Sequence, residues 1–151
     1  MGNKKMVFKI SGIVLCVLFF VLPLVQCSQD SSINASGFQI ASGTGDLMSQ
    51  AGQSYPVVFL LLIVPIVLVV VAFMGKSLAM IRNVSIAGLV AKIIFMIAAY
   101  RMLSEGDFGG SFVLTSFNWF VIIIYAGLVC FAQYCIKQEN ACSASPVSKT
   151  E

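Results

Sequence analysis

Four apolar runs alternate with short polar breaks along the chain. The first covers residues 10–25, and the others cover approximately residues 56–74, 84–103 and 117–136. A hydrocarbon core about 30 Å thick is crossed by roughly 20 residues of helix. The pattern therefore predicts an all-α, polytopic membrane helix bundle with four spans. Three spans plus a lipid anchor is the alternative, because the first run also has the form of a cleavable signal.

Composition supports a membrane protein without a soluble domain. Of the 151 residues, 59% are apolar and 10% are charged, whereas soluble proteins average about 25% charged residues. We expect residues 1–26 to form an N-terminal span or a lipoprotein-type signal and residues 27–55 an exposed exoplasmic loop. Residues 56–136 should form a three-span membrane domain, and residues 137–151 an unstructured cytoplasmic tail. Within the loop, only the surroundings of Phe38 and Ile40 suggest a short amphipathic piece.

Basic residues occupy alternate breaks, which predicts the orientation. The segment 27–55 contains no Lys or Arg, and Arg101 is the exception to the pattern, at the outer end of the third run. Cytoplasmic loops of membrane proteins carry the excess of Lys and Arg, so both termini should be cytoplasmic unless the chain is cleaved before Cys27. The net charge of +3 is too small to indicate nucleic acid. The residues that define the pattern are Lys4, Lys5, Lys9, Lys76, Arg82 and Lys137.

Cys27 is a candidate lipidation site. It follows lysines and an apolar stretch that ends in Leu24-Val25-Gln26, which is the layout of a bacterial lipoprotein signal. In such signals the thiol is acylated at the outer membrane face and the preceding helix is removed. Gln26 departs from the pattern, because a small residue normally precedes the cysteine. The alternative is an uncleaved helix that happens to end in a cysteine.

The same region carries a resemblance. A hydrophobic segment with Leu22-Pro23 near its end and a cysteine just outside it is followed by SGFQIASG at residues 36–43. This order resembles small uncharacterised bacterial multi-span membrane proteins with a prolipoprotein-like N-terminus. In them a similar cysteine and a Ser-Gly-aromatic-x-x-Ala-x-Gly segment lie in the first outer loop. The resemblance extends to about Gly45, implies a bacterial inner membrane and brings no activity with it.

Lys92 is out of place near the middle of the third apolar run. It lies about 13 Å from the expected cytoplasmic end of that run at 1.5 Å per residue. A charged Lys at a helix centre costs about 3 kcal/mol on insertion, so we expect it to face protein or an enclosed cavity, with snorkelling as the alternative. No carboxylate falls within an apolar run. The partner should therefore be another subunit, a lipid phosphate, a bound ligand or a neutral oxygen of Ser85, Asn118, Tyr125 or Gln133.

Small residues surround Lys92 at helical spacing. Gly88 lies four residues before it, and Ala87 and Ala91 are also four apart. Such spacing lets two helices approach closely in lipid. This face packs either against other spans of the same chain or against a partner subunit. The candidate partner- or ligand-binding residues are Lys92, Gly88, Asn118 and Tyr125.

The residue types favour a non-catalytic role. The chain contains no His, which removes the commonest general base and metal ligand, and Cys130, Cys135 and Cys142 match no metal-site spacing. We therefore expect no enzyme activity, metal or cofactor. The sequence favours an accessory or assembly subunit of a larger bacterial inner-membrane complex, with lipids and other membrane subunits as partners. The alternative is a small homo-oligomeric channel or transporter with a polar pathway around Lys92.

Overall fold

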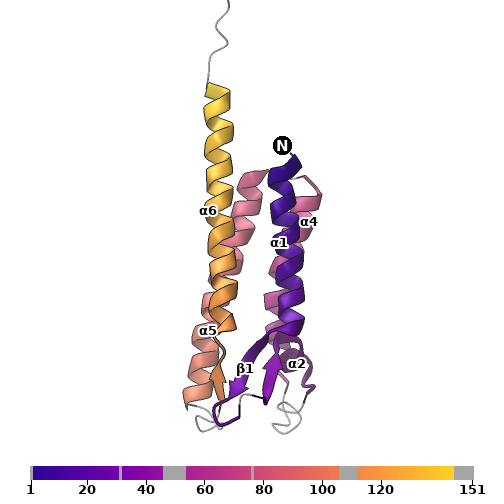
Figure 1. Ribbon diagram of the computed structural model, residues 1–151, viewed down its shortest axis with the longest axis vertical. Coiled ribbons are helices and arrows are strands. Elements are labelled where there is room, and N and C mark those ends of the chain that lie inside the picture. The colour runs from indigo at the N-terminus through magenta and orange to yellow at the C-terminus, as the bar shows by residue number, and fades with distance from the viewer. Residues whose placement is uncertain (1, 31, 46–53, 76, 106–111, 145–151) are drawn as a thin grey trace, which may run out of the picture.

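The computed structural model describes residues 2–30, 32–45, 54–75, 77–105 and 112–144. Within these ranges the chain is mostly helical, and four long helices run antiparallel to their neighbours (Figure 1). A small sheet and a short helix cover one end of the bundle. The long helices are α1 (Gly2–Val21), α4 (Leu60–Phe73, preceded by the 3-10 turn η1, Pro56–Phe59), α5 (Leu78–Glu105) and α6 (Phe117–Ala144).

Three helical stretches are long and apolar enough to cross a membrane: Pro56–Phe73, Leu78–Arg101 and Phe117–Ala141. The shortest has 18 residues and extends about 27 Å, close to the thickness of a hydrocarbon core. Helix α1 is not among them, because three lysines fall within its 20 residues. The described structure thus confirms a helical protein with three candidate spans, and it does not confirm the count of four.

The start of α5 and the end of α6 differ from those predicted. Helix α5 begins at Leu78 and not near Val84, and α6 continues to Ala144. The prediction of an unstructured tail is therefore wrong for residues 137–144, whereas residues 145–151 lie outside the described ranges. The reason is that a loss of hydrophobicity does not end a helix, and the residues after Ile136 include good helix formers with no Gly or Pro before Pro146.

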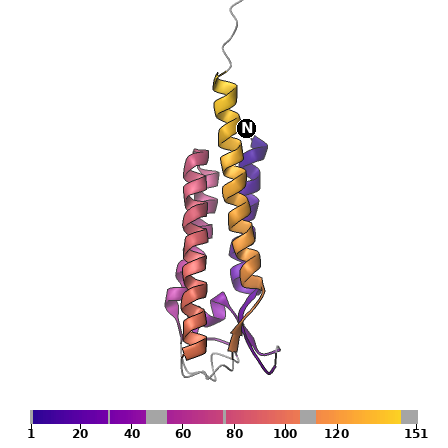
Figure 2. The same ribbon diagram turned by 90° about the vertical axis from the view of Figure 1, so that its left-hand side faces the viewer.

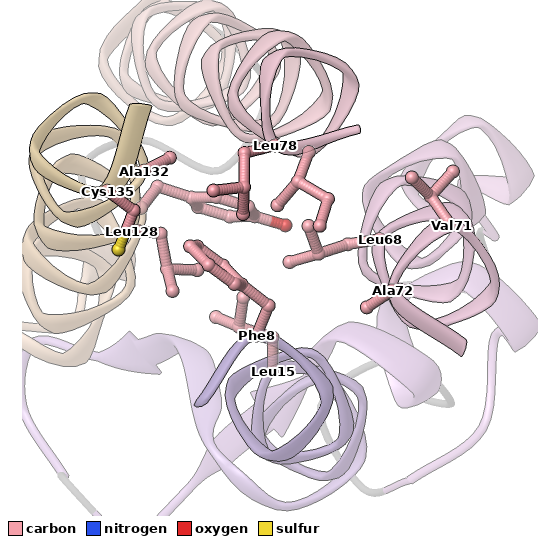
Figure 3. Packing of buried hydrophobic residues seen from close by; sticks show 11 residues of the cluster. Phe8, Leu15, Leu68, Val71, Ala72, Leu78, Leu128, Ala132 and Cys135 are labelled. Atoms are coloured by element: carbon pink, nitrogen blue, oxygen red, sulfur yellow. The ribbon is translucent and has the colours of Figure 1, made fainter. Parts of the chain in front are cut away.

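The core joins all four long helices (Figure 3). Helix α1 packs along α4, α4 contacts α5, and α5 packs along α6. Many outward-facing apolar side chains remain exposed, including Ile63, Ile94 and Ile123, which is typical of helices surrounded by lipid. The buried core cluster consists of Phe8, Leu15, Leu68, Val71, Ala72, Leu78, Ile81, Tyr125, Leu128, Ala132 and Cys135.

A three-stranded antiparallel sheet, in the order β2-β1-β3, lies beyond the end of α1. Its strands are β1 (Pro23–Cys27), β2 (Asn34–Ser36) and β3 (Phe112–Leu114). Helix α1 ends at Val21 because proline at position 23 disfavours helical geometry in the residue before it. The sheet was not predicted, since the sequence pattern assigned the end of the first apolar run to helix.

The segment after β1 is packed more tightly than the predicted exposed loop. Helix α2 (Gly37–Ser42) begins with a capping box in which the backbone N–H of Gln39 donates to the Ser36 hydroxyl, and the backbone N–H of Ser36 donates to the Gln39 side chain at 2.8 Å. Ala35, Ile40 and Ala41 are buried against α1 and the start of η1. The short helical piece near Phe38 is confirmed, whereas residues 35–41 are mostly buried and not exposed as predicted, with Phe38 as the exception.

Basic side chains lie at the end of the bundle away from the sheet. The Lys5 ammonium donates to the Gly75 carbonyl at 2.8 Å, and the Lys9 ammonium lies 4.4 Å from the centre of the Phe73 ring. The start of α1 and the end of α6 lie at this same end, opposite β1 and α2 (Figures 1 and 2). Because neighbouring helices run in opposite directions, the start of α1 lies beside the end of α4, and Lys5 and Lys9 contact residues about 65–70 positions later in the sequence.

Candidate functional site

Lys92 lies inside the protein, as predicted. Its side chain is 4% exposed, and its ammonium donates a hydrogen bond of 2.8 Å to the Oδ1 atom of Asn118, which is fully buried. The ammonium also lies 4.9 Å from the centre of the Phe95 ring, a distance suited to a cation–π interaction. Its partner is thus a neutral oxygen of the same chain, one of those that the sequence offered.

The amide of Asn118 is held so that its oxygen faces Lys92. Its Nδ2 atom donates to the backbone carbonyl of Leu24 at 2.9 Å and to that of Thr115 at 3.0 Å. The Thr115 hydroxyl donates to the carbonyl of Pro23, and the Thr115 backbone N–H donates to the carbonyl of Leu24 at 3.1 Å. We call Lys92, Asn118, Thr115 and the carbonyls of Pro23 and Leu24 the polar cluster. It joins α5, the start of α6 and β1.

The polar cluster lies where the middle of α5 meets the start of α6. Because α5 begins at Leu78, Lys92 is about 21 Å along this helix at 1.5 Å per residue. Asn118 is the second residue of α6, so it marks the end of α6 beside the sheet. Lys92 therefore lies near the middle of α5, as predicted, and the earlier start of α5 corrects only the expected distance of about 13 Å from the end of the run.

Gly88 and Tyr125 form a close contact between α5 and α6. A Cβ atom at position 88 would overlap with the Tyr125 ring, so only glycine fits this geometry. Tyr125 is buried, whereas Ala87 is exposed. At Gly88 the small-residue face thus packs within the chain, which is the first of the two predicted alternatives.

A cavity of about 40 Å³ lies where the four helices meet, beside Lys92 and Tyr125. A single water requires about 10–15 Å³ on this measure, so the space suits a few waters and excludes a larger organic molecule. Its other walls are apolar side chains of α1, α4 and α6, among them Leu18, Val64 and Val121. A lysine ammonium has three donors, and those beyond the one used for Asn118 can reach water in this space.

Cys27 lies outside the polar cluster. It is the last residue of β1, half-buried, and its backbone N–H donates to the carbonyl of Ile33 at 2.8 Å. Its thiol is free, as are those of Cys16, Cys130 and Cys135. In the described ranges no group of three or more His, Cys, Asp or Glu side chains is placed to hold a metal ion.

Sequence reasoning missed Thr115 and the two β1 carbonyls. The carbonyls belong to a strand that the apolar pattern does not distinguish from a helix. Thr115 had a usable signal, since Thr-Ser-Phe-Asn at residues 115–118 places hydroxyl residues immediately before a helix start. In comparisons with known proteins, no family model, curated protein or solved structure matches the chain.

Proposed function

We propose that the chain is a four-span protein of a bacterial inner membrane and acts as a non-catalytic accessory or assembly subunit of a larger complex. The bacterial location follows the resemblance of the N-terminal segment. Helix α1 is counted as a span because Phe8 and Leu15 belong to the same core as the other helices, and because its lysines lie at one end, where they reach the membrane surface.

The distribution of charge supports cytoplasmic termini. Lys5 and Lys9 contact Gly75 and Phe73 at the end of α4, and Arg82 near the start of α5 lines one groove with Lys137 of α6. This end of the bundle lies away from the sheet, which corresponds to the positive-inside pattern. Arg101 lies toward the opposite end, on the last part of α5. The sheet and α2 then form a small exoplasmic cap.

The exposed apolar surface is the observation that carries the proposed role, and the internally satisfied polar cluster weighs against a channel within one protomer. Lys92 is covered by its own chain, and its partner Asn118 is in turn fixed by backbone carbonyls. The cavity beside Lys92 has a volume of about 40 Å³, which is small for a polar pathway. The extensive exposed apolar surface of the protein is where lipids and other membrane subunits can bind.

The alternative is a small homo-oligomeric channel or transporter. The cavity beside Lys92 is the feature that favours it, since a few waters next to an ammonium can form part of a polar pathway. Because Lys92 is only 4% exposed in a single protomer, this pathway has to run within each protomer and not between protomers.

Affinity purification from native membranes tests the choice. A C-terminally tagged chain is extracted in a gentle detergent, its complexes are weighed by native mass spectrometry, and an unrelated tagged four-span protein serves as the control. The accessory role predicts stoichiometric heterologous membrane proteins absent from the control. A symmetric homo-oligomer without such proteins contradicts it, and ion flux in liposomes that is lost in Lys92→Met establishes the alternative.

A further inference from the structure

A second feature lies on the outside of the bundle, where α5 and α6 meet near the basic end. It is an open groove of about 510 Å³, separate from the polar cluster. Two of its lining residues, Arg82 and Lys137, are basic, and none is acidic. The α6 residues that line it recur at intervals of three and four, so they form one face of this helix.

The guanidinium of Arg82 is positioned without being neutralised. Its Nη1 atom donates to the Gln133 side-chain oxygen at 2.9 Å, and its Nε and Nη2 atoms face the Asn83 side-chain oxygen at 3.4 and 3.3 Å. Both partners are neutral amides, so the positive charge is retained. The adjacent Tyr134 hydroxyl accepts a hydrogen bond of 2.6 Å from Gln138, which leaves its own proton free to donate.

The groove changes from basic to apolar along its length. Ile86 lies one turn from Arg82 in the direction of the sheet, and Val129 and Cys130 lie two turns from Lys137 in the same direction. The basic end is therefore at the membrane surface, and the apolar end extends toward the bilayer interior. A phospholipid has the same arrangement of an anionic phosphate followed by acyl chains.

We propose that this groove binds an anionic phospholipid of the cytoplasmic leaflet. Arg82 and Lys137 bind the phosphate, Tyr134 donates a hydrogen bond to it, and one acyl chain lies along Ile86 and Val129. Basic pockets between membrane helices on the cytoplasmic side bind anionic headgroups in this way. The inference depends on the membrane orientation and is independent of the accessory-subunit role.

Lipid binding to the purified full chain tests the proposal. The protein is delipidated in a mild detergent and titrated with phosphatidylglycerol or phosphatidylcholine, and bound lipids are counted by native mass spectrometry. We expect about tenfold preference for phosphatidylglycerol, because each cation near an anionic lipid contributes about a fivefold gain in affinity and part of this is offset by competition from detergent. An unmodified chain without preference overturns the proposal.

Two variants locate the site. Arg82→Gln with Lys137→Gln should lower phosphatidylglycerol binding at least about fivefold, whereas Lys5→Gln with Lys9→Gln removes equal charge from the same end and should leave it within about twofold. Ile86→Trp should fill the apolar part and weaken binding without any change of charge. Equal losses in both charge variants, or a protein helix cross-linked in the groove of natively extracted chain, contradict the proposal. Thermal unfolding of each variant confirms that it is folded.

Discussion

At the scale of single residues, the polar cluster explains how a lysine can occur in an apolar helix. The ammonium of Lys92 exchanges water for the Asn118 oxygen and the Phe95 ring, and Asn118 is held by the carbonyl of Leu24. A buried charge is tolerated when its hydrogen bonds are made, and it is costly when one partner is removed. The two side chains should therefore depend on each other energetically.

A double-mutant cycle should reveal this coupling. Lys92→Met should lower the free energy of unfolding by about 1–2 kcal/mol, because it leaves the Asn118 oxygen buried without its donor. Asn118→Leu should cost more, about 3 kcal/mol, because the lysine charge then lacks its partner. The double variant should lose at least about 1 kcal/mol less of the free energy of unfolding than the two single variants lose together. The measurement is unfolding in mixed detergent micelles.

Ser85→Ala provides a matched control for the cycle. Ser85 is also fully buried, but its hydroxyl donates within α5 to the carbonyl of Ile81 at 3.0 Å. Ser85→Ala should lower the free energy of unfolding by no more than about 1 kcal/mol. Combined with Lys92→Met or Asn118→Leu, its effect on this free energy should be additive. Strict additivity of Lys92→Met and Asn118→Leu would show that the hydrogen bond between them contributes nothing to stability.

At the scale of elements, the sequence left open whether α1 is retained as a helix of the bundle or removed as a signal. Its side chains Phe8 and Leu15 are buried in the common core, and Gly12 lies so close to α4 that a Cβ atom there would be 2.6 Å from the Val69 side chain. Removing residues 1–26 would expose the core surfaces of α4 and α6 that α1 covers. These contacts favour the uncleaved alternative over lipidation of Cys27.

We therefore predict that the mature chain retains α1. Intact mass measurement of protein from native membranes should show a chain that includes residues 2–26, with an unmodified Cys27. Cys27→Ser should leave the abundance of the protein unchanged, and its intact mass should still correspond to a chain that includes residues 2–26. The reason is that the thiol is free and lies at the end of β1. A mass that starts at Cys27 and carries acyl groups would contradict the retained helix.

The sequence predicts the helices well and the cap poorly. Apolar runs of membrane-spanning length identify α4, α5 and α6, because lipid permits few alternatives to a helix. Strands β2 and β3 have three residues each, too few for an alternating pattern, and β3 pairs with β1 across a long separation in sequence, as in Val25 with Leu114. Within the chain, the sequence left only neutral oxygens as partners of Lys92, beside a subunit, a lipid or a ligand. The choice of Asn118 depends on where α5 begins and on that sheet.

At the scale of the whole molecule, the protein is one bundle with a basic end and a capped end. The first end holds the start of α1 and the end of α6, with Lys5, Lys9, Arg82 and Lys137 on the nearby turns. The sheet and α2 form the second end (Figure 2). The proposed lipid groove opens near the basic end, and the polar cluster lies beside the cap. The lipid proposal therefore requires that the basic end faces the cytoplasm, as the distribution of Lys and Arg favours.

Accessibility from the two sides of the membrane tests this arrangement most directly. An impermeant thiol reagent is applied to intact cells that express either Ser42→Cys or Ala141→Cys in a background without native cysteines, and an N-terminal tag is probed in the same cells. Both substituted positions are exposed in the structure. The account predicts that Ser42→Cys reacts from outside, and that Ala141→Cys and the tag become accessible only after the cells are opened. Reaction of both cysteines from the same side, or a tag on the side of Ser42, would contradict the four-span bundle.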